Sequence, residues 1–151
     1  MTTATLQSPA STDEAEILAL LDTVRKAHLE KNAAGIAAPY ATHAAIFDLE
    51  PPLAHDGIDV GRKERWLAGW DTPIELEAWE VKITVSGDTA FTHGYLRMSG
   101  TPKAAGRGVS FWMRQTVCLE RAGGAWRIVH EHTSVPFYMD GSLRPAFDLA
   151  P

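Results

Sequence analysis

The sequence lacks the features that mark secreted and membrane-spanning proteins. Its 151 residues include a single cysteine, Cys118, which excludes an intramolecular disulfide framework. No stretch approaches the roughly 20 consecutive apolar residues of a membrane span, and residues 1–10 have no signal-peptide pattern. We therefore expect a soluble, cytoplasmic protein with no membrane partner.

Positive charge is also scarce. The chain has 14 Lys and Arg against 19 Asp and Glu, and its basic residues are scattered apart from Arg62, Lys63 and Arg65. Because binding to a nucleic-acid backbone normally requires a basic stripe, we expect no nucleic-acid partner. Aromatic residues are frequent, with five Trp, five Phe and three Tyr. They suit either a bulky core, which we expect for Trp66, Trp70 and Trp79, or the wall of a pocket for a small apolar or aromatic ligand.

The first half of the chain carries helical signals. Residues 1–10 are small and polar and predict a flexible tail, and residues 11–14 have the pattern of a capping box. Apolar positions and one histidine then recur with helical spacing at Ile17, Leu21, Val24 and His28. The pattern predicts helices over 11–32 and 59–70, the latter capped by Asp59, and a shorter helical piece that follows residues 33–35 and ends at Tyr40.

The second half is typical of strands. A short strand is predicted over 45–49, followed by four long ones over 77–85, 89–99, 109–120 and 126–137. This order predicts an α+β fold, with three N-terminal helices packed on a strongly curved, mostly antiparallel sheet that encloses a pocket. We expect a single domain over 11–140, between the N-terminal tail and a C-terminal tail over 141–151.

The closing strand carries a family resemblance. Residues 126–137 read Trp-Arg-Ile-Val-His-Glu-His-Thr-Ser-Val-Pro-Phe, and residues 111–116 read Phe-Trp-Met-Arg-Gln-Thr. The first run resembles the closing strand of a SnoaL-like subgroup of the nuclear transport factor 2-like superfamily and of the association domain of calcium/calmodulin-dependent protein kinase II. The second run resembles the same SnoaL-like subgroup. The resemblance covers about residues 13–138 and implies a cystatin-like cone. It also implies a homodimer formed through the sheet.

Asp48 is the first candidate for chemistry. It lies late in the first predicted strand, before Pro51 and Pro52, where the resemblance to ketosteroid isomerases implies a proton-shuttling carboxylate. The oxyanion donors of those isomerases fall near Val24 and Trp112, and neither side chain is a comparable donor. Asp48 is therefore a pocket residue that acts as a catalytic base, a pocket residue without that role, or a strand-end aspartate in a turn.

Two polar rows and a histidine pair supply further candidates. Alternation places His93, Tyr95 and Arg97 on one face of their strand and Trp112 and Arg114 on one face of the next. We expect at least one row to face the cavity, where Arg114 would stabilise an enolate; on the other face it would form a cross-strand ion pair.

The histidine pair lies in the closing strand. Alternation places His130 and His132 on one face, where two such side chains can reach one metal ion. A polar pocket or a dimer contact is the interpretation that we favour, and we expect no metal and no cofactor.

These observations leave three functional hypotheses. The first is a cofactor-free isomerase, cyclase or hydratase with Asp48 as the base. The second is a non-catalytic ligand-binding or dimerisation module of the same fold. The third is a metal-dependent enzyme that uses the histidine pair. The predicted catalytic residues are Asp48, Arg114 and His130. The predicted substrate-binding residues are Tyr40, His93, Tyr95, Trp112 and His132.

Overall fold

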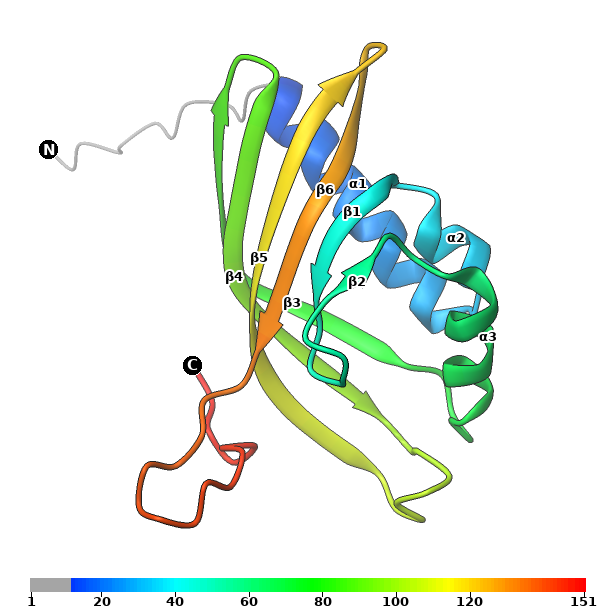
Figure 1. Cartoon of the computed structure of the whole chain (residues 1–151), viewed down its shortest axis with the longest axis vertical. Helices are drawn as coiled ribbons and strands as arrows, with labels where there is room; N and C mark the ends of the chain where they lie inside the picture. The colour runs from blue at the N-terminus through cyan, green and yellow to red at the C-terminus, as the bar shows by residue number, and fades with distance from the viewer. Residues whose placement is uncertain (1–11) are drawn as a thin grey trace, which may run out of the picture.

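The computed structural model describes residues 12–151, which form three helices and six strands (Figure 1). The predicted tail over 1–10 and the first residue of the predicted capping box, Ser11, lie outside the described residues. The helices are α1 (Thr12–Leu29), α2 (Ala33–Ala37) and α3 (Val60–Ala68). The strands are β1 (Tyr40–Phe47), β2 (His55–Asp56), β3 (Glu75–Ser86), β4 (Thr89–Gly100), β5 (Val109–Ala122) and β6 (Ala125–Ser134).

Helix α1 packs on the sheet through the face that its sequence predicts. Ile17, Leu21 and Val24 are buried, and Ala27 takes the fourth buried position. His28 lies one residue further along and is only partly buried, because it borders a cavity. The burial of each large apolar side chain contributes about 1.5–3 kcal/mol.

The two shorter helices begin at side-chain caps. Asn32 accepts a hydrogen bond of 2.9 Å from the amide of Gly35, and Asp59 accepts one of 2.8 Å from the amide of Arg62. Each cap satisfies an amide that has no partner within the helix, and the predicted cap at Asp59 is confirmed. Among residues 12–151, no helix is both long enough and apolar enough to cross a membrane.

The six strands form one sheet in the order β2-β1-β6-β5-β4-β3. β1 runs parallel to β6, and all the other neighbours are antiparallel. The three helices lie on one side of the sheet, and β3, β4 and β5 bend around them (Figure 1). The predicted α+β class with a curved, mostly antiparallel sheet is confirmed.

The core consists of two apolar clusters between the helices and the sheet. One joins α1 to the strands and includes Ile17, Leu119 and Ile128. The other joins α2 and α3 to the start of β3 and includes Ile36 and Ile74. Residues of both clusters border the same cavity, so the packing that holds the helices on the sheet also forms the walls of the pocket.

A β-bulge in β3 reverses the direction of its side chains. Trp79 pairs with Tyr95 and Lys82 with His93, so β3 contains one residue more than β4 at this point. Glu80 adopts a left-handed backbone with φ of 50°. Trp79 therefore faces outward and is 51% exposed, which makes the prediction of a core residue wrong.

A second bulge lies in β6. Ile128 pairs with Leu119 and His130 pairs with Cys118, which leaves Val129 as the extra residue. Side-chain alternation restarts after a bulge, so residues on its two sides no longer share a face by even spacing. Ile128 is buried on the helical side of the sheet, but His130 points to the outer side.

The residues after β6 fold back on themselves. The amide of Tyr138 donates to the carbonyl of Arg144 at 2.9 Å, and the Phe147 ring lies 4.4 Å from that of Phe111 on β5. Ala146 is buried. The predicted boundary at residue 140 falls within this turn, which extends beyond the end of β6 and away from the helices (Figure 1).

Candidate functional site

A cavity of about 170 Å³ lies between the helices and the sheet. Its walls are mainly aliphatic side chains and methionines, together with Trp66 from α3. The polar and charged residues that line it are Arg25, His28, Tyr40, Asp48, Glu50, Lys63, Gln115, Glu131 and Thr133. An apolar pocket with a few converging polar groups is the usual form of a small-molecule site.

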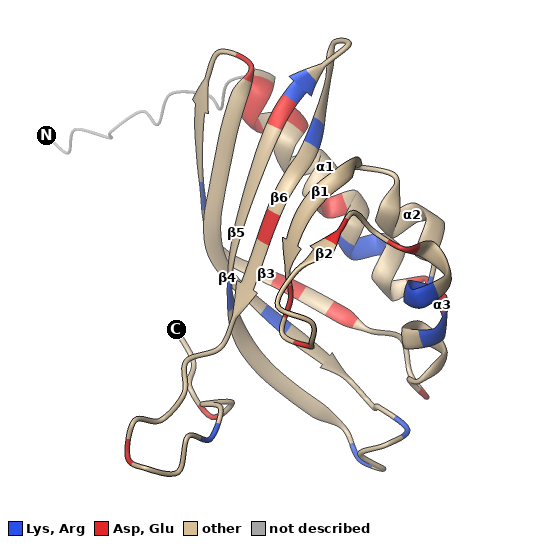
Figure 2. Cartoon of the chain, in the orientation of Figure 1, with Lys and Arg blue, Asp and Glu red and all other residues tan. Residues whose placement is uncertain are grey.

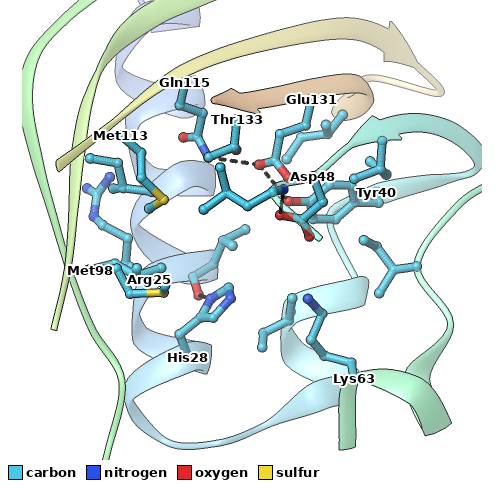
Figure 3. Close-up of a pocket in the computed structure, with 18 of the residues that line it drawn as sticks. Arg25, His28, Tyr40, Asp48, Lys63, Met98, Met113, Gln115, Glu131 and Thr133 are labelled. Carbon is cyan, nitrogen blue, oxygen red and sulfur yellow. Dashed lines mark hydrogen bonds between the residues drawn. The ribbon is translucent and has the colours of Figure 1, made fainter. Parts of the chain in front are cut away.

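Glu131 is the most strongly perturbed acid of this pocket. Its Oε1 accepts a hydrogen bond of 3.0 Å from the hydroxyl of Tyr40 and one of 3.1 Å from the side-chain amide of Gln115 (Figure 3). Burial raises the pKa of Glu131 to about 7, and the negative charge of Asp48 acts in the same direction. The hydrogen bond from Tyr40 and the charge of Lys63 oppose this rise. The carboxyl is thus a proton donor and acceptor near neutral pH.

Tyr40 keeps its proton at the neutral pH values at which Glu131 titrates. Burial raises the pKa of Tyr40 well above its ordinary value, and the charge of Glu131 adds to the effect. The hydroxyl therefore acts as a fixed donor to Oε1 of Glu131. Tyr40, a predicted substrate-binding residue, lies on the cavity wall, and its hydroxyl is directed to Glu131.

Asp48 follows the last residue of β1 and lines the same cavity, on the side where Tyr40 and Glu131 lie (Figure 3). Its Oδ1 accepts a hydrogen bond of 2.8 Å from the amide of Leu49. Its charge raises the pKa values of both Glu131 and Tyr40. The charge of Asp48 therefore acts on a second carboxyl group in the same pocket, and carboxyl groups in unlike environments can take the separate roles of acid and base.

The helices contribute a histidine and two cations. The Nδ1 atom of His28 lies 2.8 Å from the carbonyl oxygen of Val24, and burial lowers the pKa of this histidine to about 4. Arg25 forms an ion pair of 3.3 Å with Asp22. Lys63 lies 4.7 Å above the Trp66 ring, and no ion pair joins it to a carboxylate anywhere in residues 12–151.

The lysine and arginine side chains near the cavity come from the helices. Lys and Arg gather on α3 and on the adjoining part of α1 (Figure 2). Arg62 is occupied by an ion pair of 2.6 Å with Glu50. Lys63 lines the cavity. The helical side of the pocket is therefore its basic side.

Neither of the predicted polar rows lines the cavity. Tyr95 pairs with Arg114, and His93 pairs with Thr116, so both rows share one face of the sheet. The alternate residues of β4 and β5, including Leu96 and Met113, line the cavity instead. The prediction that one row faces the cavity is wrong.

The outer residues find partners on their own face. The Nε of Arg114 donates to the hydroxyl of Ser134 at 3.2 Å, and Arg97 lies 5.6 Å above the Trp112 ring. Tyr95 is 37% exposed. The predicted roles of Arg114, Trp112 and Tyr95 would thus require a ligand on the outer side of the sheet.

The histidine pair also lies on the outer face. Nδ1 of His130 is 2.7 Å from the carbonyl oxygen of Ala45, and Phe47 packs edge-on against His130 and His132 at 4.8 and 5.5 Å between ring centroids. The bulge at Val129 is the physical reason, because it turns Glu131 rather than its two neighbours toward the cavity. In the part of the chain that the structure describes, no three His, Cys, Asp or Glu residues are grouped to hold a metal ion.

Sequence reasoning missed Glu131, Gln115 and Thr133. Gln115 and Thr133 lie directly opposite one another on β5 and β6. Each of the three missed residues is next to a predicted site residue in the sequence. Its side chain therefore lies on the other face of the strand from that predicted residue. Strict alternation along β6, counted from Ile128, places Glu131 and Thr133 on the face away from the cavity. A valine at position 129 does not indicate a bulge. The available signal was an acid between two histidines in a predicted strand.

The comparisons agree with this architecture. A family model described as SnoaL-like domain matches residues 17–138. A nuclear transport factor 2-like protein of unknown function from Pseudomonas putida KT2440 is 30% identical, covering 94% of this chain and 99% of its own, with a TM-score of 0.82. No match was found among curated proteins.

Two more distant structures share the fold. A nuclear transport factor 2-like protein with a cystatin-like fold from Novosphingobium aromaticivorans is 16% identical, with 86% and 84% of the two chains covered and a TM-score of 0.66. A protein of the same family from Streptomyces avermitilis, provisionally assigned as a dehydratase, is 15% identical, with 82% and 95% covered and a TM-score of 0.69. The cystatin-like fold expected from the sequence is confirmed, and the chain belongs to the SnoaL-like domain family of the nuclear transport factor 2-like superfamily.

Proposed function

We propose that the cavity is an acid–base site that transfers a proton on a small, largely apolar substrate without a cofactor. Asp48 is the base and Glu131 the acid. The observation that carries this assignment is the buried Glu131 carboxyl, which Tyr40 and Gln115 hold by one oxygen on the same side of the cavity as Asp48. Pairs of carboxyl groups in unlike environments commonly divide the two roles in this way.

The proposed reaction begins at a carbon next to a carbonyl group. Asp48 removes a proton from that carbon, and the C–H electron pair becomes the double bond of an enol or enolate. The carbonyl oxygen gains the negative charge, and protonated Glu131 stabilises it by a hydrogen bond. Both donors to Glu131 bind Oε1, so Oε2 is the oxygen that has no partner among residues 12–151 and is free to meet the substrate.

The same pair supports the release of water from a β-hydroxy carbonyl compound. Asp48 retains the proton from the α-carbon, the C–O bond of the hydroxyl breaks, and Glu131 protonates the leaving oxygen to form water. The provisional dehydratase from Streptomyces avermitilis supports this variant of the reaction, since it shares the fold. Isomerisation differs only in returning the first proton to another carbon.

Deuterium exchange tests the proton transfer without knowledge of the product. The purified protein is incubated in D₂O with a panel of small enolisable ketones, and proton NMR follows the loss of the α-proton signal. Asp48→Asn should slow exchange by about 10²–10⁴-fold, the usual contribution of a positioned base. Asp56→Asn, in an exposed aspartate that pairs with His43, is the matched control and should exchange like wild type.

The alternative is a binding module of the same fold that performs no chemistry. It predicts that ketones bind the protein, as detected by line broadening, while α-proton exchange stays at the buffer rate. Equal exchange rates for wild type and Asp48→Asn would likewise eliminate the role of Asp48 as base.

We also propose that two copies of the chain pair through the outer face of the sheet. Large aromatic side chains are exposed there, including Trp79 at 51%, Phe91 at 44% and Tyr95 at 37%. Covering them would remove apolar area from water. Sedimentation velocity should give a dimer at micromolar concentration for wild type and a monomer for Tyr95→Asp. Leu53→Asp, at an apolar residue that is 97% exposed and lies off the sheet, should leave the dimer intact. A wild-type monomer would refute the pairing.

A further inference from the structure

The polar groups of the cavity lie at two ends. Asp48, Tyr40 and Glu131 occupy the end formed by β1 and β6, and His28 lies at the opposite end, on α1 (Figure 3). Met98 and Met113 lie along one wall of the cavity together with Arg25 (Figure 3). The proposed proton transfer uses only the first end. His28 therefore has no part in that chemistry, and its position must be explained separately.

The hydrogen bond to the helix backbone determines which nitrogen of His28 carries the proton. A carbonyl oxygen can only accept, so Nδ1 must donate its proton to the oxygen of Val24 at 2.8 Å. Two charged groups act on the ring from facing elements, Lys63 from α3 and Asp48 from the end of β1, and they have opposite effects. Burial is the largest influence and lowers the pKa of His28 to about 4, so the ring is neutral at pH 7. Its other nitrogen, Nε2, carries a lone pair and can only accept.

This acceptor is open to the cavity. Nε2 takes part in no hydrogen bond within residues 12–151, since the only bond of the His28 side chain is made by Nδ1. In the same part of the chain, no fully buried side-chain nitrogen or oxygen lacks a partner. Nε2 is therefore accessible, and the cavity is the space that His28 borders. An acceptor held in place by a backbone bond and facing a mainly apolar cavity is suited to recognise one donor group.

We propose that the ligand of this cavity carries a hydroxyl or N–H group that donates a hydrogen bond to Nε2 of His28. This assignment deepens the proposed function, on which it rests for the reacting end of the substrate. The substrate class is then a small compound with a carbonyl group at the Asp48–Glu131 end and a hydrogen-bond donor at the far end. An oxygen without a hydrogen, placed directly against Nε2, would oppose its lone pairs to that of Nε2 and would be disfavoured at that point.

Two probes of nearly equal shape test the assignment. p-Cresol and p-xylene differ only in a hydroxyl that replaces a methyl group. Long-range ¹H–¹⁵N NMR at pH 7 should show His28 protonated at Nδ1 and should show its Nε2 resonance move upfield as p-cresol is added, but not as p-xylene is added. Titration should give tighter binding of p-cresol by about 2- to 12-fold, which corresponds to one net hydrogen bond.

Substitution of the acceptor provides the second measurement. His28→Leu should bind the two probes with equal affinity, whereas His43→Leu, at an exposed histidine outside the cavity, should retain the preference for p-cresol. If His28→Leu fails to fold, the wild-type NMR titration by itself tests the proposal. The proposal is overturned if p-cresol does not bind in the millimolar range, if it leaves Nε2 unshifted, or if its preference persists in folded His28→Leu.

The probe experiment is independent of the proton-transfer assay. Neither probe has an enolisable carbon, so a failure of α-proton exchange would remove the proposed reaction and leave the result at His28 intact. Conversely, Asp48-dependent exchange without any preference for p-cresol would retain the reaction and refute the substrate class.

Discussion

Replacing Glu131 with glutamine should stabilise the protein at neutral and alkaline pH. Glutamine keeps the shape of the side chain and a carbonyl oxygen that can accept from Tyr40 and Gln115, but it carries no titratable group. The folded protein holds the pKa of Glu131 at about 7, compared with the ordinary value of 4.5. Because burial disfavours the charged form, ionisation of Glu131 requires more free energy in the folded protein than in the unfolded chain. It therefore lowers the free energy of unfolding.

The direction of the pH dependence follows from proton binding. Below a pH of about 4.5, the carboxyl is protonated in both the folded and the unfolded state, so glutamate and glutamine should give similar free energies of unfolding. Between about 4.5 and about 7, the unfolded chain releases the proton while the folded protein keeps it, so the wild type loses stability as pH rises. Above about 7, both states are ionised and the loss is complete.

The magnitude follows from the separation of the two pKa values. At about 1.4 kcal/mol for each pH unit, the interval from 4.5 to about 7 corresponds to at most about 3.5 kcal/mol. The actual value should be smaller, because Glu131 borders a cavity that admits water. We therefore expect Glu131→Gln to exceed the wild type by about 1–3 kcal/mol at pH 8 and to match it near pH 4.5.

Urea unfolding followed by tryptophan fluorescence, repeated from pH 4.5 to pH 8.5, measures this difference. Other titrating groups affect both proteins and cancel when the two free energies are subtracted. Glu120→Gln, at an exposed glutamate on β5, is the control and should show no such pH-dependent gain. A difference between wild type and Glu131→Gln that stays constant with pH, or that decreases toward alkaline pH, would refute the assignment of Glu131 as a buried acid.

Three further substitutions test the framework of the pocket. Gly94→Ala should cost about 1–3 kcal/mol, since its Cβ would lie 3.0 Å from Cα of Val81 at the β3 bulge, whereas Gly61→Ala on α3 should be neutral or slightly stabilising. Leu119→Ala, at a fully buried position, should cost about 2–5 kcal/mol. Asn32→Ala should cost about 1 kcal/mol by removing the cap of α2. Urea midpoints measure all three, and a Gly94→Ala protein as stable as wild type would refute the close approach at the bulge.

The elements of this fold were predictable from local patterns. The four long strands end near the predicted residues because turn residues mark their limits, and the Asp59 cap sets the start of α3. The first strand was predicted too short, since β1 begins at Tyr40, and the two-residue strand β2 was not predicted. The pairing of β1 with β6 connects distant parts of the chain, and no local signal specifies it.

The faces of the strands were less predictable than their limits. Alternation correctly groups His93 with Tyr95 and Trp112 with Arg114, but it cannot say which group faces the helices. That choice depends on which side of the sheet packs against α1, a tertiary property. Asp48 was selected through the resemblance to ketosteroid isomerases, which requires no assumption about strand faces, and it does line the cavity.

The bulge in β6 decides which chemistry the cavity contains. Ile128 faces the core, and unbroken alternation from it would direct His130 and His132 inward and turn Glu131 to the outer face. The extra residue, Val129, exchanges these two sets. The register between β1 and β6 also shifts between Tyr40 and Ala45, at the same level of the sheet. Irregularities in two neighbouring strands thus bring the hydroxyl of Tyr40 to the carboxyl of Glu131, and a regular sheet with the same sequence would have lined the pocket with imidazoles instead of an acid.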